Sequence, residues 1–134
     1  MSGVAIVRAL LAADPTVAAI VGPRVYTGVV PQGVQLPAIG VSKISGSEET
    51  NTARNLPLAL IRHRVQVTAL AKDYPTMEKL LRAAKLGGGV RTGTVVGFKV
   101  RSILPWGENP EIPPGDDKIY EQSRDFMVTF VEAN

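Results

Sequence analysis

His63 is the only histidine, and so the side chain best suited to acid–base chemistry near neutral pH. It lies between Ile61 and Val65 in a stretch that alternates apolar and polar residues, which places it on the apolar side of a strand. A general base needs a partner and access to substrate, so we expect a buried or interfacial structural histidine. The competing hypothesis, a hydrolase that uses His63 with a neighbouring carboxylate, requires an accessible ring with a strongly shifted pKa.

The remaining side chains also argue against catalysis. There is no cysteine, and no serine stands in a nucleophile-elbow pattern. One histidine with scattered carboxylates does not supply three or four metal ligands at a familiar spacing. The glycine-rich residues 87–93 (GGGVRTG) follow a predicted helix, whereas a phosphate loop precedes one. We predict no catalytic residue, no metal and no cofactor.

The charges are few but unevenly distributed. A net charge of +3 is far below the dense basic stripe of a protein that grips nucleic acid. Residues 79–107 contain six basic residues and no acidic one, whereas residues 108–125 contain six acidic residues and two basic ones. The sequence therefore implies two complementary surfaces.

Two explanations of this asymmetry stay open. Two long strands that pair antiparallel would bring Lys99 and Arg101 to Glu121 and Asp125 within one molecule. Alternatively, a basic face on one subunit meets an acidic face on the next, in a heterologous interface that closes into a ring.

A connector rich in proline and glycine carries the clearest candidates for contact with a neighbour. Trp106 lies in it, and a large aromatic residue on a loop either covers the core or anchors an interface. The predicted subunit or partner interface comprises Lys99, Arg101, Trp106, Glu108, Glu111, Ile112, Asp116 and Asp117.

Helical and strand patterns follow one another along the chain. Apolar residues at helical spacing predict a helix over residues 4–11, and Asp14 before Pro15 predicts the cap of a second short helix that ends at Gly22. Residues 24–26 and 38–45 are strand candidates. Residues 45–55 (SGSEETNTARN) have no large apolar anchor, which favours an exposed hairpin tip.

The second half of the chain predicts most of the sheet. Residues 61–69 alternate with a period of two, as a half-buried antiparallel strand requires. Asp73 caps a helix whose apolar side comprises Met77, Leu80, Leu81 and Ala84, ended by the glycines at 87–89. Residues 94–104 and 118–132 are two long strands, with Val96, Phe98 and Val100 expected to face Phe126, Val128 and Phe130.

This order predicts an α+β fold, with a mostly antiparallel sheet and helices packed on one face. At 134 residues we expect a single domain that covers residues 1–134. No apolar run reaches the roughly 18 residues that a membrane span needs, and the first residues lack the basic leader of a signal peptide.

Three segments together resemble a known family. Residues 9–46 (ALLAADPTVAAIVGPRVYTGVVPQGVQLPAIGVSKISG) combine a helix, a D-P turn, an R-V-Y strand and P-Q-G followed by L-P. Residues 64–84 (RVQVTALAKDYPTMEKLLRAA) and 120–130 (YEQSRDFMVTF) continue the likeness in order. The chain resembles the bacteriophage tail completion family, the small neck proteins that terminate the tails of long-tailed phages.

The resemblance implies a structural subunit that works by shape and contact. It implies a homo-oligomeric ring of six copies that caps the tail tube, meets the tube protein and offers a surface to the head–tail connector or stopper protein. DNA would be only passing cargo, and no membrane is involved. The expected location is the tail neck of the virion, after assembly in the host cytoplasm.

Such a ring has a lumen, and several charged residues are candidates to line it or to face the tube. They are Glu48, Glu49, Arg54, Arg62 and Arg64. A solvated outer sheet face explains the arginines equally well. A monomeric module that binds a peptide or small ligand is the alternative function, and it predicts a deep apolar pocket.

Overall fold

The computed structural model describes residues 2–49, 58–86 and 93–133. The chain opens with two helices, α1 (Ser2–Ala13) and α2 (Pro15–Val21). The Asp14 side chain accepts hydrogen bonds from the backbone N–H groups of Thr16 and Val17, at 2.9 and 3.4 Å. It thereby satisfies two of the N–H groups that a helix start leaves without a partner. The predicted pair of helices and its cap are confirmed.

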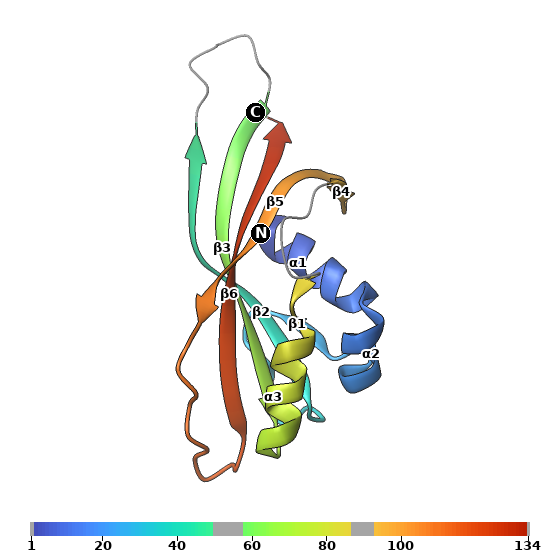
Figure 1. The fold of residues 1–134 in the computed structure, drawn as a ribbon, viewed down its shortest axis with the longest axis vertical. Helices are drawn as coiled ribbons and strands as arrows, with labels where there is room; N and C mark the ends of the chain where they lie inside the picture. The colour runs from blue at the N-terminus through green and yellow to red at the C-terminus, as the bar shows by residue number, and fades with distance from the viewer. Residues whose placement is uncertain (1, 50–57, 87–92, 134) are drawn as a thin grey trace.

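A six-stranded sheet in the order β1-β2-β3-β6-β5-β4 forms the rest of the frame (Figure 1). Only β1 and β2 pair in parallel, and the other neighbours are antiparallel. The strands are β1 (Val25–Thr27), β2 (Ala38–Glu49), β3 (Leu58–Ala71), β4 (Gly93–Val95), β5 (Phe98–Glu108) and β6 (Tyr120–Ala133). The predicted α+β class with a mostly antiparallel sheet is therefore confirmed.

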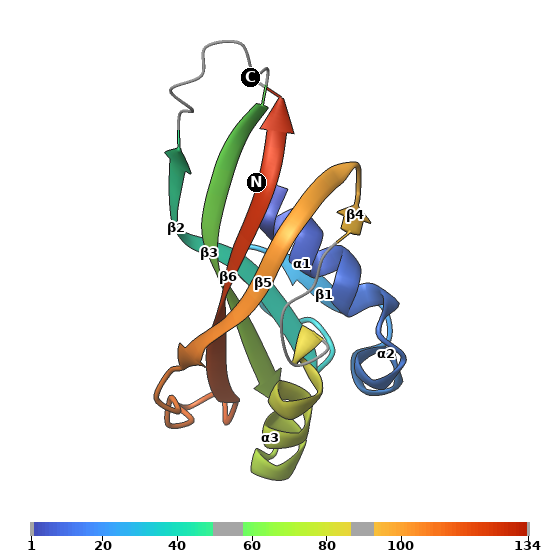
Figure 2. The same cartoon turned by 45° about the horizontal axis from the view of Figure 1, so that its top comes forward.

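The helices α1, α2 and α3 (Tyr74–Ala83) lie on one side of this twisted sheet, which we call the covered face (Figures 1 and 2). Val65 and Val67 of β3 and Phe126 and Phe130 of β6 are almost completely buried beneath them. The predicted apolar side of α3 is buried as well. The alternating residues of β3 and β6 point to the opposite side, the open face.

The predicted strand over residues 94–104 is wrong in its first part. The chain turns at Val96 and Gly97, whose φ angles are 44° and 84°, so β4 and β5 form a tight hairpin. Two successive positive φ angles are the mark of a type I′ turn. Val96 is consequently 55% exposed and not in the core, whereas Val100 is buried and Phe98 packs against the core.

Two predicted loops also begin later than expected. β5 continues through Trp106 to Glu108, so Trp106 lies on a strand and not in the connector. Residues 45–49 extend β2 instead of forming a hairpin tip. The helix α3 ends at Ala83 with Ala84 as its C-cap, so it stops before the glycines at 87–89 that were expected to end it. Residues 50–57 and those glycines lie outside the described residues.

Within the described residues, no single helix has the length and apolar character to cross a membrane. Residues Gly3–Ala13 and Pro15–Val21 meet that test only when joined across their 84° bend.

Candidate subunit and partner interfaces

His63 has a structural environment. Its Nδ1 atom accepts a hydrogen bond of 3.2 Å from the backbone N–H of Gly3, and its ring packs edge-on against Phe130 at 5.1 Å. Burial lowers the pKa of His63, and the positive charges of the amino terminus and Lys43 lower it further. The ring is thus half-buried, hydrogen-bonded and packed against an aromatic side chain, as the sequence suggested for a structural histidine.

Two glycines make room for this ring. A Cβ atom on Gly3 would lie 2.7 Å from the His63 Cβ, and one on Gly46 would lie 2.8 Å from its Cδ2. Both separations are below van der Waals contact, so a larger residue at either position displaces the imidazole. The sequence carried no signal for this role, because the three residues lie far apart in the chain.

No cluster of three or more histidine, cysteine or acidic side chains that could hold a metal occurs in residues 2–49, 58–86 and 93–133.

A polar network occupies the open face near the end of β5. The Arg64 guanidinium holds Asp125 through two contacts, 2.6 Å from Nη2 and 2.7 Å from Nε. The Asn109 amide donates to Asp125 at 3.0 Å and to Ser123 at 2.9 Å, and Gln66 donates to Ser123 at 3.1 Å. Asp125 is only 3% exposed. We call these five residues the open-face network.

One of the predicted lumen residues belongs to the open-face network, and the other described ones lie elsewhere. Arg64 is committed to Asp125, with 37% of its side chain exposed. Arg62 and Glu48 are exposed on β3 and β2. Glu49 is the last residue of β2, opposite Leu60. Arg54 lies outside the described residues.

The two long strands, β5 and β6, do pair antiparallel. Their register, however, does not bring Lys99 and Arg101 to Glu121 and Asp125, so those predicted ion pairs are wrong. Lys99 lies opposite Val131, and Glu108 lies opposite Arg124. Asp125 is taken by Arg64 instead. Lys99 and Arg101 are exposed and have no ion pair among the described residues.

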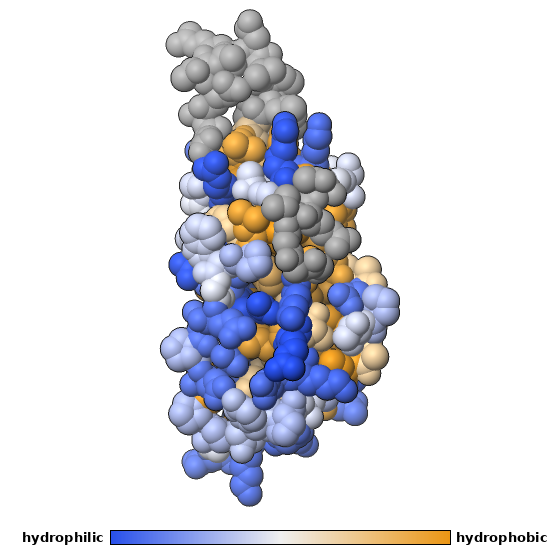
Figure 3. Space-filling view, in the orientation of Figure 1, coloured by the Kyte–Doolittle hydropathy of each residue, from blue (hydrophilic) through white to orange (hydrophobic). Residues whose placement is uncertain are grey.

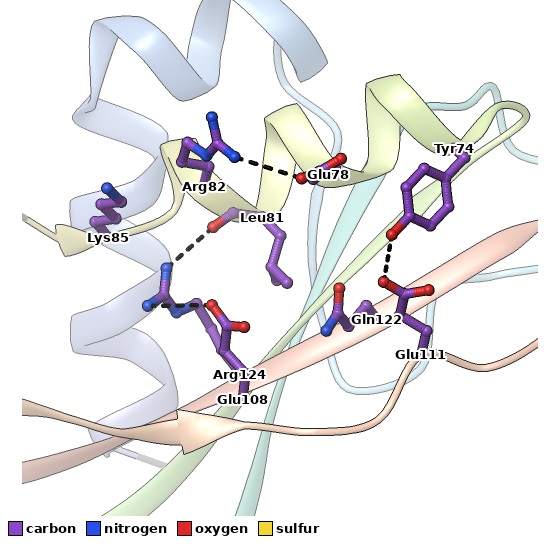
Figure 4. A pocket seen from close by; sticks show the side chains of 9 residues that line it. All are labelled: Tyr74, Glu78, Leu81, Arg82, Lys85, Glu108, Glu111, Gln122 and Arg124. Atoms are coloured by element: carbon purple, nitrogen blue, oxygen red, sulfur yellow. Dashed lines mark hydrogen bonds and ion pairs between the residues drawn. The ribbon is translucent and has the colours of Figure 1, made fainter.

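A polar pocket of about 280 Å³ lies between α3 and the ends of β5 and β6 (Figure 4). Arg124 donates to the Leu81 carbonyl at 3.2 Å, and its Nη2 lies 3.9 Å from Glu108. Tyr74 donates to Glu111, which raises the pKa of the Tyr74 hydroxyl. Two predicted interface residues, Glu108 and Glu111, therefore share one pocket with cationic side chains, and the acidic and basic groups are mixed there.

The other predicted interface residues follow in the connector to β6. Ile112 is 53% exposed, and its backbone N–H donates to the Glu121 carbonyl at 2.9 Å. Asp116 and Asp117 are exposed, and Asp117 accepts from the Ile119 N–H at 3.2 Å. These residues lie at the opposite end of the sheet from Lys99 and Arg101 (Figure 1), so the predicted set forms no single patch.

A wide groove of about 740 Å³ lies on the open face, between the loop after β1 and the start of β6. Its floor includes Gly40, Gln66 and Thr68, and its wall includes Val30 and Leu36. Figure 3 shows mainly hydrophilic side chains over the lower end of the molecule, with hydrophobic ones in patches higher up and toward the helices.

Comparisons with known proteins match both sequence and fold. A family model described as "Tail completion protein gp17" matches residues 5–92. No curated protein matches the sequence. A solved structure described as "Virion of native gene transfer agent (GTA) particle" contains a chain with a TM-score of 0.74 and 14% identity, over 98% of this chain and 97% of that chain. At this identity the likeness concerns the fold.

Proposed function

Because the chain belongs to the tail completion protein gp17 family, we propose that it is the tail terminator subunit of a phage-like virion. It is a structural tail completion protein and not an enzyme. In the proposed function, six copies form a ring at the head-proximal end of the tail tube. The ring joins the tail to the head connector, and DNA passes through it.

The family match over residues 5–92 carries this proposal. It is supported by the similar fold of a chain from the virion of a gene transfer agent particle, which extends over nearly the whole of both chains. Exposed charges such as Lys99 and Arg101, which have no ion pair in the part of the chain that the structure describes, also suit a subunit that completes its contacts in an assembly.

The first test is the mass of the purified protein by light scattering, alone and with completed tail tubes. A closed ring in either condition is the expected result. A protein that stays monomeric and ignores tubes would overturn the proposal.

The lumen hypothesis has a separate test. Arg62 is exposed on the open face, and Arg62→Glu is expected to leave ring formation intact while it blocks infectivity, since like charges repel the passing DNA. Lys79→Glu on the exposed side of α3 is the matched control and should leave both unchanged. Equal infectivity of the two variants would contradict the lumen role.

The open-face groove favours the second candidate, a monomeric module that binds a peptide or ligand. This function predicts a monomer that ignores tail tubes, and a binding partner whose affinity falls when Thr68→Arg fills the groove floor. Normal tail completion by Thr68→Arg would exclude the groove from the terminator function.

A further inference from the structure

Each outer long strand of the sheet is paired along only part of its outer side. β1 covers β2 only at Ile39–Val41, and β4 covers β5 only at Phe98–Val100. In the described structure, residues 42–49 of β2 and 101–108 of β5 have no strand on their outer side (Figure 2). We call these two stretches the β2 free edge and the β5 free edge. Such edges present unpaired N–H and C=O groups that can pair with another strand.

Exposed apolar side chains gather on the same two stretches. Ile44 on the β2 free edge is 48% exposed, and Leu104 and Trp106 on the β5 free edge are 36% and 52% exposed. Isolated edges are ordinarily protected by short length or by charge. The two free edges carry charges, including Lys43, Glu48 and Arg101, but they are long. Their exposed apolar side chains indicate a surface that is covered in the working state.

The strand directions fit one arrangement. β2, β3, β6 and β5 follow one another in antiparallel pairs, so β2 and β5 run in opposite directions. A second copy rotated about an axis along the strands therefore brings its β5 antiparallel to the first copy's β2. Head-to-tail repetition pairs both edges of every copy, whereas a two-fold dimer through one edge leaves the other open.

We propose that the β5 free edge of one copy pairs with the β2 free edge of the next, so that the sheets join edge to edge around the ring. This inference rests on the proposed function, because it names the contact that closes the ring. The partner is a second copy of this chain, and the backbone hydrogen bonds of the added strand pair supply the contact.

One register matches the faces of the side chains from Ser102 to Gly107 with those of β2. With Ser47 opposite Ser102, both point to the open face, since Ser47 pairs with Arg62 and Ser102 with Thr129. β2 has one register shift, between Lys43 and Ser45, whereas β5 has two, between Val100 and Ser102 and between Pro105 and Gly107. The shift in β2 coincides with the second shift in β5, so the faces stay matched from Ser102 to Gly107. Arg101 lies at the first shift, just outside this matched stretch.

The same register also matches the charges. Glu48 comes next to Arg101, the extra residue at the first register shift of β5. Lys43 lies on the same face as Glu108, one diagonal position away. Diagonal neighbours are about 7–8 Å apart and remain within reach of long side chains. Lys43, Glu48 and Arg101 have no ion pair among the described residues, so all three are available to a neighbour.

Disulfide trapping tests the register, because the natural chain has no cysteine. Ser47→Cys protein is mixed with Ser102→Cys protein under mild oxidation, in the presence of tail tubes. The expected result is at least tenfold more covalent dimer than when Ser47→Cys is mixed with Thr94→Cys, an exposed residue of β4 off the free edges. The double variant Ser47→Cys/Ser102→Cys should give a ladder that ends at the ring.

The outcomes separate this inference from the proposed function. Rings by light scattering without Ser47–Ser102 trapping overturn the edge pairing and leave the terminator function standing. Trapping in open chains that never close supports the pairing and contradicts a closed ring. Dimers from Ser47→Cys alone, at the yield of the mixture, indicate two-fold pairing and overturn the inference.

A side-chain variant gives an independent test. Leu104→Asp places a charge on the β5 free edge at a position already partly exposed, so the subunit is expected to fold. Association should weaken at least tenfold in light scattering, with an unchanged circular dichroism spectrum. Val96→Asp, at the exposed hairpin turn, is the control and should assemble normally. Normal assembly of Leu104→Asp would overturn the inference.

Discussion

Charged side chains are paired within the chain in the open-face network, whereas most of those on the two free edges are not paired in the part of the chain that the structure describes. In the network, Arg64 and Asn109 both bind the buried Asp125. On the free edges, Glu48 and Arg101 are exposed and have no ion pair among the described residues. One region completes its hydrogen bonds within the chain, while the other leaves backbone and side-chain groups for a neighbour. The difference separates residues that stabilise the subunit from residues that are free to assemble it.

The largest expected effect comes from the same substitution made in each region. Arg64→Met leaves the Asp125 carboxylate buried with only Asn109 beside it, and should lower the free energy of unfolding by about 3 kcal/mol. Arg101→Met removes an exposed charge and should change it by less than about 0.5 kcal/mol. Urea unfolding of the monomer measures both. Equal losses of unfolding free energy in the two variants would contradict the difference between the two regions.

A substitution in the hairpin that leads into the β5 free edge should increase the stability of the subunit. Val96 is a β-branched residue at a φ of 44°, a conformation that Asn adopts more readily. Val96→Asn should therefore raise the free energy of unfolding by about 1 kcal/mol. Val29→Asn is the control, since Val29 is 90% exposed without a positive φ angle and should have little effect. A loss of stability in Val96→Asn would contradict the turn type.

Charge exchange should alter assembly more than stability. Lys43→Glu and Glu108→Lys should each weaken association by about fivefold, because an exposed ion pair contributes up to about 1 kcal/mol. Glu108→Lys also removes the contact of Glu108 with Arg124 of its own chain, at 3.9 Å, so Lys43→Glu is the cleaner single variant. Combining both changes in one chain restores opposite charges across the proposed interface and should restore association. Light scattering across a concentration series measures this. If association is not restored in the double variant, Lys43 and Glu108 do not form an ion pair across the interface.

The smallest expected effect is a pH dependence centred on His63. Its pKa is lowered in the folded chain, first by burial, so below about pH 6.5 the unfolded chain takes up a proton that the folded chain resists. Stability should therefore fall as the pH drops below that value. His63→Gln should flatten the dependence of the melting temperature on pH. If the melting temperature depends on pH in the same way in both proteins, other titrating groups cause the loss of stability.

Local patterns predicted the elements well where one physical rule acted alone. The alternation of residues 61–69 and the caps at Asp14 and Asp73 lie where expected. The end of β5 was missed because Pro105 and Gly107 ordinarily stop a strand. An edge strand tolerates a proline, however, because only one side of its backbone is hydrogen-bonded to a strand of the same chain. Val96 was misplaced because valine favours strands and gave no sign of a turn.

The sequence by itself determined the periodicity, the helix caps and the lack of a catalytic set, since these depend on residue type and on near neighbours. Only the tertiary structure decided that Arg64 meets Asp125, and that Gly3 and Gly46 enclose His63. It also decided which halves of β2 and β5 stay unpaired. Such contacts depend on strand register and on where the short flanking strands end, and both are fixed by packing between segments far apart in the chain.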